Sequence, residues 1–335
     1  MKKIFLITLA AVVLAAVAGN KALAQARSYA VLWKNGEARY LTGKDGEAIA
    51  RSVYVLGNDI YVTGYERRNT QGKDVATLWK NGINQSLTDG TRYAAAYSVY
   101  VTDSDVYVVG LEYNAQINEI ATFWKNGKAR YLTDRDGEAI ARSVYVSDGD
   151  VYVVGYERRN TQEKDVATLW KNGIAQNLTN GRNKAGARSV YVLDNDVYIA
   201  GYEQNAQEKN VATLWKNGIS QSLTDGNNGA IAYSVYVSNG DVYVAGYEEK
   251  FATLWKNGIS QSLTDGNSEE IAYSVYVSYM WRDIKESLPR FGKTVYPRAL
   301  LMEGVRRLLI LFTFLMVIYM LQAMRLCPGT LFLRK

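Results

Sequence analysis

The chain has 335 residues, of which 48% are hydrophobic and 21% charged, a composition typical of a globular protein. It contains no histidine and one cysteine, which excludes histidine-based catalytic triads, histidine-ligated metals, cysteine-rich zinc sites and an internal disulfide. The net charge is +6. Residues 1–24 carry three lysines, and residues 279–335 carry ten basic and three acidic residues, so the two ends together have a charge of +10. Residues 25–278 therefore have a net charge of −4. A mildly acidic middle argues against a nucleic-acid partner.

The first 24 residues have the pattern of a secretory signal peptide. Lys2 and Lys3 precede an uncharged apolar run over 4–18, and Ala22-Leu23-Ala24 provides a small-residue cleavage site. We therefore expect export to the periplasm, the cell surface or the medium. An uncleaved N-terminal membrane anchor is the alternative.

One motif repeats through the middle of the chain. The string Trp-Lys-Asn-Gly recurs every 40–46 residues, at Trp33, Trp79, Trp124, Trp170, Trp215 and Trp255. Ser-Val-Tyr-Val stands 19 residues after each Trp, and a glycine stands 31 residues after each of the first five. A repeat of this length predicts stacked copies of one supersecondary unit.

Each unit predicts four short strands and no helix. In the copy around Trp170, Asn172-Gly173 predicts a tight hairpin turn, because both central residues of such a turn need positive φ. Repeated four-stranded meanders predict an all-β fold, a β-propeller over 25–278 with about six blades, the last of them incomplete. We expect the N-terminal strands in 30–41 and the C-terminal strand 271–277 to share that last blade.

The repeat resembles that of exported bacterial proteins with tandem Ala-Thr-Leu-Trp-Lys-Asn-Gly units, over residues 28–277. In period and strand count it is also similar to WD-type and kelch-type propellers, although their Gly-His…Trp-Asp and double-glycine motifs are absent. The resemblance implies a propeller and carries no activity, so no functional residue is transferred from it.

The composition changes abruptly after Ser278. All three prolines, the cysteine and five of the six methionines lie in 279–335. Residues 308–324 carry no charge, and as a helix they would span about 25 Å at 1.5 Å per residue, slightly less than the roughly 30 Å of a bilayer core. We expect an unrelated tail with a hydrophobic, candidate transmembrane helix at 308–324, which would associate the chain with a membrane. An evolved anchor and a frameshift or gene fusion both explain the change.

Two nearly identical variable loops are the candidates for ligand binding. They begin Glu-Arg-Arg-Asn-Thr-Gln at Glu66 and at Glu157, two repeats apart. Because loops on a rigid scaffold commonly bind ligands, an anionic or sugar ligand is predicted at Arg67, Arg68, Arg158 and Arg159. A duplicated two-repeat segment with solvated arginines explains the same pattern.

Acidic and aromatic residues recur at equivalent positions of the repeat. One acidic row is Asp89, Asp134, Asp225 and Asp265, and another is Asp59, Asp105, Asp150, Asp196 and Asp241. Repeated carboxylates suit calcium binding or glycoside hydrolysis, but aspartate is also a favoured turn residue. A residue that every unit carries is best explained by what every unit needs, so we predict turn and packing roles, no metal and no cofactor.

These patterns favour a non-catalytic exported scaffold that binds a glycan or a protein at the cell surface through its loop-rich face. Catalysis requires a departure in one blade, and the sequence alone shows no unique cluster, so an enzyme is not expected. The alternatives are a carbohydrate-active hydrolase or lyase that uses acidic loop residues, and a frameshifted product without function.

Overall fold

A computed structural model describes residues 28–34, 37–43, 46–67, 72–134, 138–158, 164–266 and 269–278, together with the backbone of strands at 8–10 and 296–301. All regular elements in these ranges are strands. Two compact units, Met1–Met302 and Glu303–Lys335, divide the chain, and every described residue lies in the first. The predicted transmembrane segment 308–324 lies outside the described residues, among which no helix has the length and apolarity to cross a bilayer.

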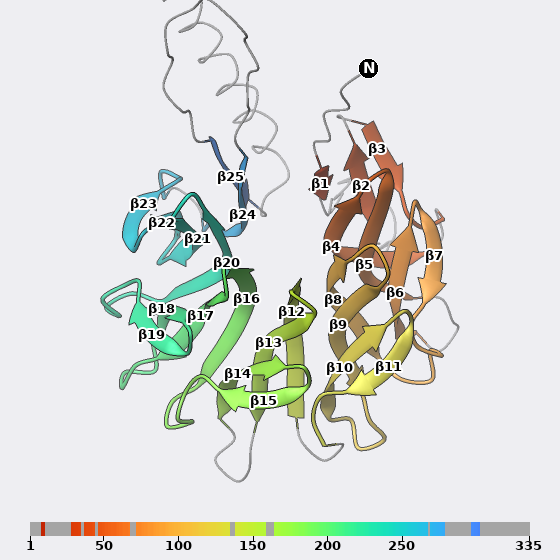
Figure 1. Ribbon diagram of the computed structural model, residues 1–335, viewed down its shortest axis with the longest axis horizontal. Coiled ribbons are helices and arrows are strands. Elements are labelled where there is room, and N and C mark those ends of the chain that lie inside the picture. The colour runs from red at the N-terminus through yellow and green to blue at the C-terminus, as the bar shows by residue number, and fades with distance from the viewer. Residues whose placement is uncertain are drawn as a thin grey trace, which may run out of the picture. The chain divides into compact units, whose positions relative to one another are not determined.

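Five four-stranded antiparallel sheets, here blades 1 to 5, form most of the structure (Figure 1). Blade 1 contains β4 (Glu47–Leu56), β5 (Asp59–Arg67), β6 (Asp74–Lys80) and β7 (Ile83–Ser86). Blade 2 contains β8 (Ala94–Val101), β9 (Val106–Tyr113), β10 (Glu119–Lys125) and β11 (Lys128–Tyr131). Blade 3 contains β12 (Glu138–Ser147), β13 (Asp150–Arg158), β14 (Asp165–Lys171) and β15 (Ile174–Asn177).

Blades 4 and 5 repeat this order. Blade 4 contains β16 (Ala185–Leu193), β17 (Asp196–Gln204), β18 (Asn210–Lys216) and β19 (Ile219–Ser222). Blade 5 contains β20 (Ala230–Ser238), β21 (Asp241–Glu248), β22 (Phe251–Lys256) and β23 (Ile259–Ser262). The first strands of the blades lie on the inner side of the arrangement and contact one another in sequence (Figure 1). The predicted all-β fold of repeated four-stranded, propeller-like sheets is confirmed.

The two ends of the repeat do not share a sheet in the described residues. β2 (Val31–Lys34) and β3 (Glu37–Tyr40) pair with each other and with β1 (Thr8–Ala10). β24 (Ala272–Ser278) pairs with β25 (Tyr296–Leu301). The expectation that the N-terminal pair and the C-terminal strand form one blade is therefore wrong here, because β25 supplies the second strand that residues 279–287 lack in sequence.

The Ser-Val-Tyr-Val segments join neighbouring blades. The backbone N–H of Val144 in blade 3 donates to the Oγ of Ser98 in blade 2 over 3.3 Å. Equivalent bonds of 3.2–3.4 Å occur at the other four junctions from blade 1 to β24. The tyrosines of the same segments pack ring against ring with centroids 4.8–5.1 Å apart, in the order Tyr54, Tyr100, Tyr145, Tyr191, Tyr236 and Tyr276.

The glycine of each repeat is required by a close backbone approach. A Cβ at Gly155 of β13 would lie 1.8 Å from the carbonyl oxygen of Ile140 in β12, so no other residue fits. At this point the register of the two strands shifts between Ala141 and Ser143, which makes Arg142 the extra residue of a β-bulge. The same shift occurs in blades 1, 2, 4 and 5.

The repeated tryptophans form the contacts between blades. Trp79, Trp124, Trp170, Trp215 and Trp255 are each 0% exposed. Trp170, on β14 of blade 3, packs with Tyr107, Val109 and Ala121 of blade 2 in one apolar cluster. The packing role predicted for the row is confirmed, and these rings are closed to a ligand.

Replacing Trp170 with alanine should lower the free energy of unfolding by about 3–5 kcal/mol, because a fully buried aromatic ring leaves a large cavity. Denaturant unfolding of the full chain measures this. Ile174→Ala is the control, since Ile174 on the neighbouring β15 is 70% exposed and its truncation should change little. Equal stability of the Trp170 variant and the unchanged protein would contradict the packing role.

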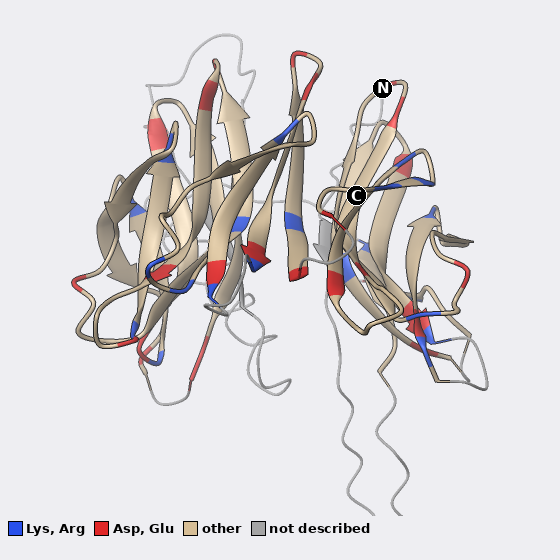
Figure 2. Cartoon of the chain, turned by 90° about the horizontal axis from the view of Figure 1, so that it is seen from below, with Lys and Arg blue, Asp and Glu red and all other residues tan. Residues whose placement is uncertain are grey.

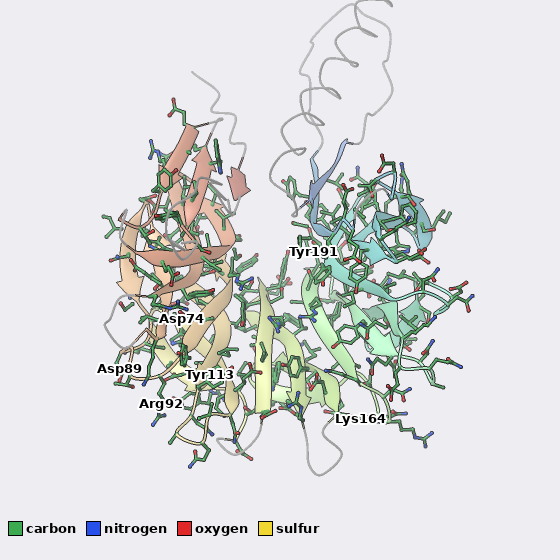
Figure 3. All side chains as sticks on the ribbon, turned by 180° about the vertical axis from the view of Figure 1, so that it is seen from behind. Asp74, Asp89, Arg92, Tyr113, Lys164 and Tyr191 are labelled. Atoms are coloured by element: carbon green, nitrogen blue, oxygen red, sulfur yellow. The ribbon has the colours of Figure 1, made fainter. Side chains whose placement is uncertain are left out.

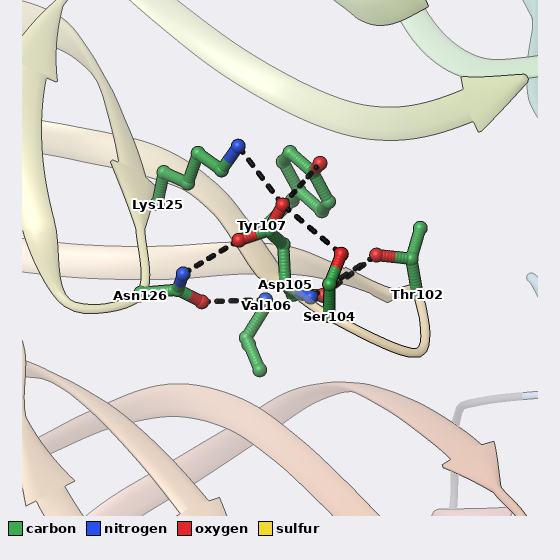
Figure 4. A network of polar contacts seen from close by, with 7 residues as sticks. All are labelled: Thr102, Ser104, Asp105, Val106, Tyr107, Lys125 and Asn126. Atoms are coloured by element: carbon green, nitrogen blue, oxygen red, sulfur yellow. Dashed lines mark hydrogen bonds and ion pairs between the residues drawn. The ribbon is translucent and has the colours of Figure 1, made fainter. Parts of the chain in front are cut away.

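One polar network recurs in each blade, between the Lys-Asn of Trp-Lys-Asn-Gly and the aspartate at the start of the second strand (Figure 4). In blade 2 the Lys125 ammonium lies 2.9 Å from Asp105 Oδ2, and Asn126 Nδ2 donates to Asp105 Oδ1 over 2.7 Å. Asn126 Oδ1 also accepts the backbone N–H of Val106 at 2.8 Å. The network ties the turn between the first two strands to the turn between the last two.

Hydrogen bonds from Lys125 and then from Asn126 lower the pKa of Asp105 below its usual value. A carboxylate with a depressed pKa in the folded state stabilises the protein above its unfolded pKa, and this contribution disappears as the pH falls through the folded value. Asp105→Asn should therefore lower the melting temperature at pH 7. The difference from the unchanged protein should shrink as the pH falls below about 3.9.

Melting temperatures measured across pH 2–8 test this dependence. Asp103→Asn, an exposed neighbour in the same turn, is the matched control and should show no such convergence. A constant difference between the Asp105 variant and the unchanged protein at all pH values would show that the carboxylate charge has no part in the network.

Candidate functional site

Three strands of each blade bring charged residues to the end that carries the longer loops. At this end of each blade the first strand begins, the second strand ends and the third strand begins. We call it the loop-rich end. Figure 2 shows acidic and basic residues mostly at strand ends and in loops. In blade 1 the register places Glu47 opposite Arg67, and Arg67 opposite Asp74. Blade 3 aligns Glu138, Arg158 and Asp165 in the same way.

The first arginine of each predicted binding loop is held by these carboxylates. Arg67 Nη2 lies 2.9 Å from Asp74 Oδ1, and Arg67 also forms an ion pair with Glu47. Burial lowers the pKa of Arg67, but the ion pairs with Asp74 and Glu47 outweigh it and raise the pKa overall. The network therefore fixes the base of the loop.

Blade 3 repeats the arrangement with a more buried carboxylate. Asp165 is 3% exposed, lies 2.9 Å from Arg158 Nη2 and 3.2 Å from Lys184 Nζ. The second arginines of the two loops, Arg68 and Arg159, lie outside the described residues. A ligand at these four arginines stays a prediction.

Blade 2 departs from this pattern at both positions. Tyr113 stands where blades 1 and 3 have an arginine, and Glu119 stands where they have an aspartate. The Tyr113 hydroxyl donates to Glu119 Oε1 over 3.0 Å. The Tyr156 hydroxyl, from β13 of blade 3, donates to Glu119 Oε2 over 3.3 Å. One carboxylate thus receives two phenolic hydrogen bonds from two blades.

Both tyrosines keep their protons at neutral pH. Burial first, and then the hydrogen bond and charge of Glu119, raise the pKa of Tyr113 to about 12. Burial and the charge of Glu119 also raise the pKa of Tyr156, although Arg142 opposes the shift. Glu119 is half-buried, and within the described ranges no lysine or arginine forms an ion pair with it.

Two further carboxylates lie near these tyrosines. The charge of Glu138 acts on Tyr113, and that of Asp165 acts on Tyr156. The blade 2–3 cluster is defined as Tyr113, Glu119, Glu138, Tyr156 and Asp165. Figure 3 shows Tyr113 near Asp74, Asp89 and Arg92.

Sequence analysis missed this cluster, and the statement that no unique cluster exists is wrong. The signal is visible when the repeats are aligned. Where the repeats before and after have Arg67 and Arg158, this repeat has Tyr113. Where they have Asp74 and Asp165, it has Glu119. Only the structure shows that Tyr156 of the next blade completes the arrangement.

The repeated acidic rows serve the turns. Asp89 Oδ1 accepts the backbone N–H of Thr91 at 2.9 Å and its hydroxyl at 2.7 Å, and Asp225 accepts the equivalent N–H of Asn227 at 2.9 Å. In the part of the chain that the structure describes, no three acidic or cysteine side chains gather in a way that could hold a metal ion. The turn chemistry inferred for these rows agrees with the geometry.

No protein-family model matches the chain, and no curated protein is similar to it in sequence. Several solved structures are similar to it at low sequence identity. An acylaminoacyl peptidase from Pyrococcus horikoshii has a TM-score of 0.45 and 14% identity, and the match covers 72% of this chain and 42% of the peptidase. The endosialidase of phage phi92 has a TM-score of 0.43 and 12% identity, with 84% and 70% covered.

The β-propeller domain of the trilobed protease from Pyrococcus furiosus has a TM-score of 0.35 and 14% identity, with 79% of this chain and 92% of that domain covered. Other similar structures are a puromycin hydrolase, a puromycin-hydrolysing peptidase, a GH32 β-fructofuranosidase, an α-L-arabinofuranosidase and a GH43_12 protein. The chain spans less than half the length of the acylaminoacyl peptidase and the puromycin hydrolase.

The expectation of a non-catalytic scaffold and no enzyme is not upheld, since the solved structures to which the chain is similar are mostly hydrolases. That expectation assumed that the repeats are equivalent. Blade 2 differs from its neighbours at the two positions that build the blade 2–3 cluster.

Proposed function

We propose that the chain is a carbohydrate-active hydrolase with Glu119 as its general base. The observation that carries the proposal is the carboxylate of Glu119, which is held by Tyr113 and Tyr156 and has no ion-pair partner among the described residues. A base held within hydrogen-bond reach of oriented groups is the arrangement that proton transfer requires.

The available side chains favour sugar chemistry over peptide chemistry. The chain has no histidine, so it cannot assemble the Ser-His-Asp machinery of a serine peptidase. Glycoside hydrolysis is commonly performed by carboxyl groups alone. The rings of Tyr113 and Tyr156, whose hydroxyls donate to Glu119, provide flat apolar faces that suit a sugar ring.

The proposed reaction is a single displacement by water. Glu119 takes a proton from the water as its oxygen bonds to the anomeric carbon. The bond from that carbon to the leaving oxygen breaks, and the leaving oxygen takes a proton from solvent at the loop-rich end. The hydroxyls of Tyr113 and Tyr156 orient the carboxylate before the proton is transferred.

Export belongs to the same proposal. A signal peptide at 1–24 would place the enzyme outside the cytoplasm, where polysaccharides are accessible, and a helix at 308–324 would hold it at a membrane. These segments and the tandem-repeat resemblance are the finer parts of the proposal. They rest on the sequence patterns.

Glu119→Gln should lower kcat for glycoside hydrolysis about 10²–10⁴-fold, the usual contribution of a general base. The assay uses the full chain with a panel of nitrophenyl glycosides and oligosaccharides, both neutral and acidic. Tyr156→Phe should also lower kcat, because it removes one of the two hydrogen bonds that orient the base. Nitrophenyl glycosides should react fastest, since their leaving oxygen needs no protonation.

Glu37→Gln is the matched control, because Glu37 is exposed and lies beside a short turn at the opposite end of its sheet. Its activity should equal that of the unchanged protein. The proposal is overturned if the unchanged protein hydrolyses no member of the panel, or if Glu119→Gln hydrolyses its best substrate at the full rate.

A further inference from the structure

The bulge residue of each first strand forms a row along the inner strands of the blades. Its members are Arg51, Tyr97, Arg142, Arg188, Tyr233 and Tyr273. Because the register shifts at this residue, it has no partner across the ladder and its side chain is released from the regular alternation of the strand. The row is called the arginine–tyrosine row.

Arg142 and Arg188 come from adjacent blades and have no counter-charge. Neither forms an ion pair with a carboxylate of the described residues, and the Nε of each is buried without a hydrogen-bond partner. By contrast, Arg67 and Arg158 of the same chain are held by two carboxylates each. Two neighbouring cations of this kind repel each other, and their burial costs hydration free energy. A bound anion would offset both unfavourable contributions.

Aromatic rings hold the two guanidinium groups in place. The Arg142 guanidinium lies 4.7 Å from the centroid of the Tyr97 ring. The Arg188 guanidinium lies 5.5 Å from the Tyr202 ring and 5.8 Å from the Tyr233 ring. Stacking of this kind orients the planar fork of an arginine without using its N–H donors. Burial, and then the charge of Arg142, lower the pKa of Arg188, which agrees with a cation that lacks an anionic partner.

Tyr156 links the arginine pair to the candidate base. Arg142 acts electrostatically on Tyr156, whose hydroxyl donates to Glu119 over 3.3 Å. An anionic group held by Arg142 and Arg188 would therefore belong to the sugar whose anomeric carbon is attacked by the water that Glu119 deprotonates. Arg51 is different, because it is exposed and lies on the other side of Tyr97.

We propose that Arg142 and Arg188 bind the anionic group of an acidic sugar, so that the substrates are glycans carrying carboxylate or sulfate. The inference rests on the proposed hydrolase function and names its substrate class. Two guanidinium forks offer several N–H donors to a carboxylate or sulfate, and the tyrosine rings offer faces to the sugar.

Binding to the full chain is measured by calorimetry with methyl β-glucuronide, glucose 6-sulfate and the neutral methyl β-glucoside. The unchanged protein should bind at least one anionic sugar and not the neutral one, and the affinity should fall as salt rises. The double variant Arg142→Gln/Arg188→Gln should weaken binding about 30-fold or more, as for loss of a buried charge partner. Comparison of the two anionic sugars tells whether carboxylate or sulfate is preferred.

Single Arg142→Lys and Arg188→Lys variants keep the charge and guard against misfolding of the double variant. Each should fold and bind more weakly, because lysine lacks the planar fork. Arg92→Gln, an exposed arginine of the loop-rich end, is the matched control and should bind normally.

Glu119→Gln separates the two proposals. If it abolishes hydrolysis and retains binding of the anionic sugar, both proposals stand. If the unchanged protein hydrolyses neutral glycosides and binds the glucuronide, the sulfate and the glucoside equally or not at all, the arginine proposal is overturned while the hydrolase proposal survives. Equal binding of the anionic sugar by the Arg142→Gln/Arg188→Gln variant and by the unchanged protein would also overturn it.

Discussion

The hydrogen bond from a valine N–H of one blade to the serine Oγ of the preceding blade is the interaction on which the rest of the structure depends. It recurs at every junction from blade 1 to β24. Each such bond contributes only about 1 kcal/mol to stability. It fixes the position of each first strand along the first strand of the neighbouring blade. The tyrosine stack and the buried tryptophans then pack in the same register around it.

The bulge just before that serine links the fold to the site. It absorbs one residue per blade, so Ser143 can reach the next blade while Arg142 is left outside the ladder. The same local device therefore joins the blades and presents the arginine–tyrosine row. Because the framework is repeated, a functional difference needs no new backbone. In blade 2, Tyr113 takes the place of an arginine and Glu119 takes the place of an aspartate. A structural ion pair is thereby replaced by a candidate base.

Much of the fold is readable from the sequence because each feature has a local cause. Asn172 and Gly173 have φ of 53° and 83°, as the hairpin turn requires, and the Trp spacing sets the blade length. The pairing of β24 with β25 was missed because Tyr296–Leu301 lacks the repeat pattern. The site was missed for another reason. Its members become neighbours only through contacts between blades, such as that of Tyr156 with Glu119, which no single repeat reveals.

Glu119 as a base and Arg142 with Arg188 as an anion subsite together form one proposed site across blades 2 to 4. A crystal structure of the full-length Glu119→Gln variant with an acidic disaccharide would show whether one ligand occupies both parts. We expect an anionic group within about 2.7–2.9 Å of both guanidinium groups and the glycosidic bond beside position 119. A disaccharide bound only at the loops of Arg67 and Arg158 would contradict this arrangement.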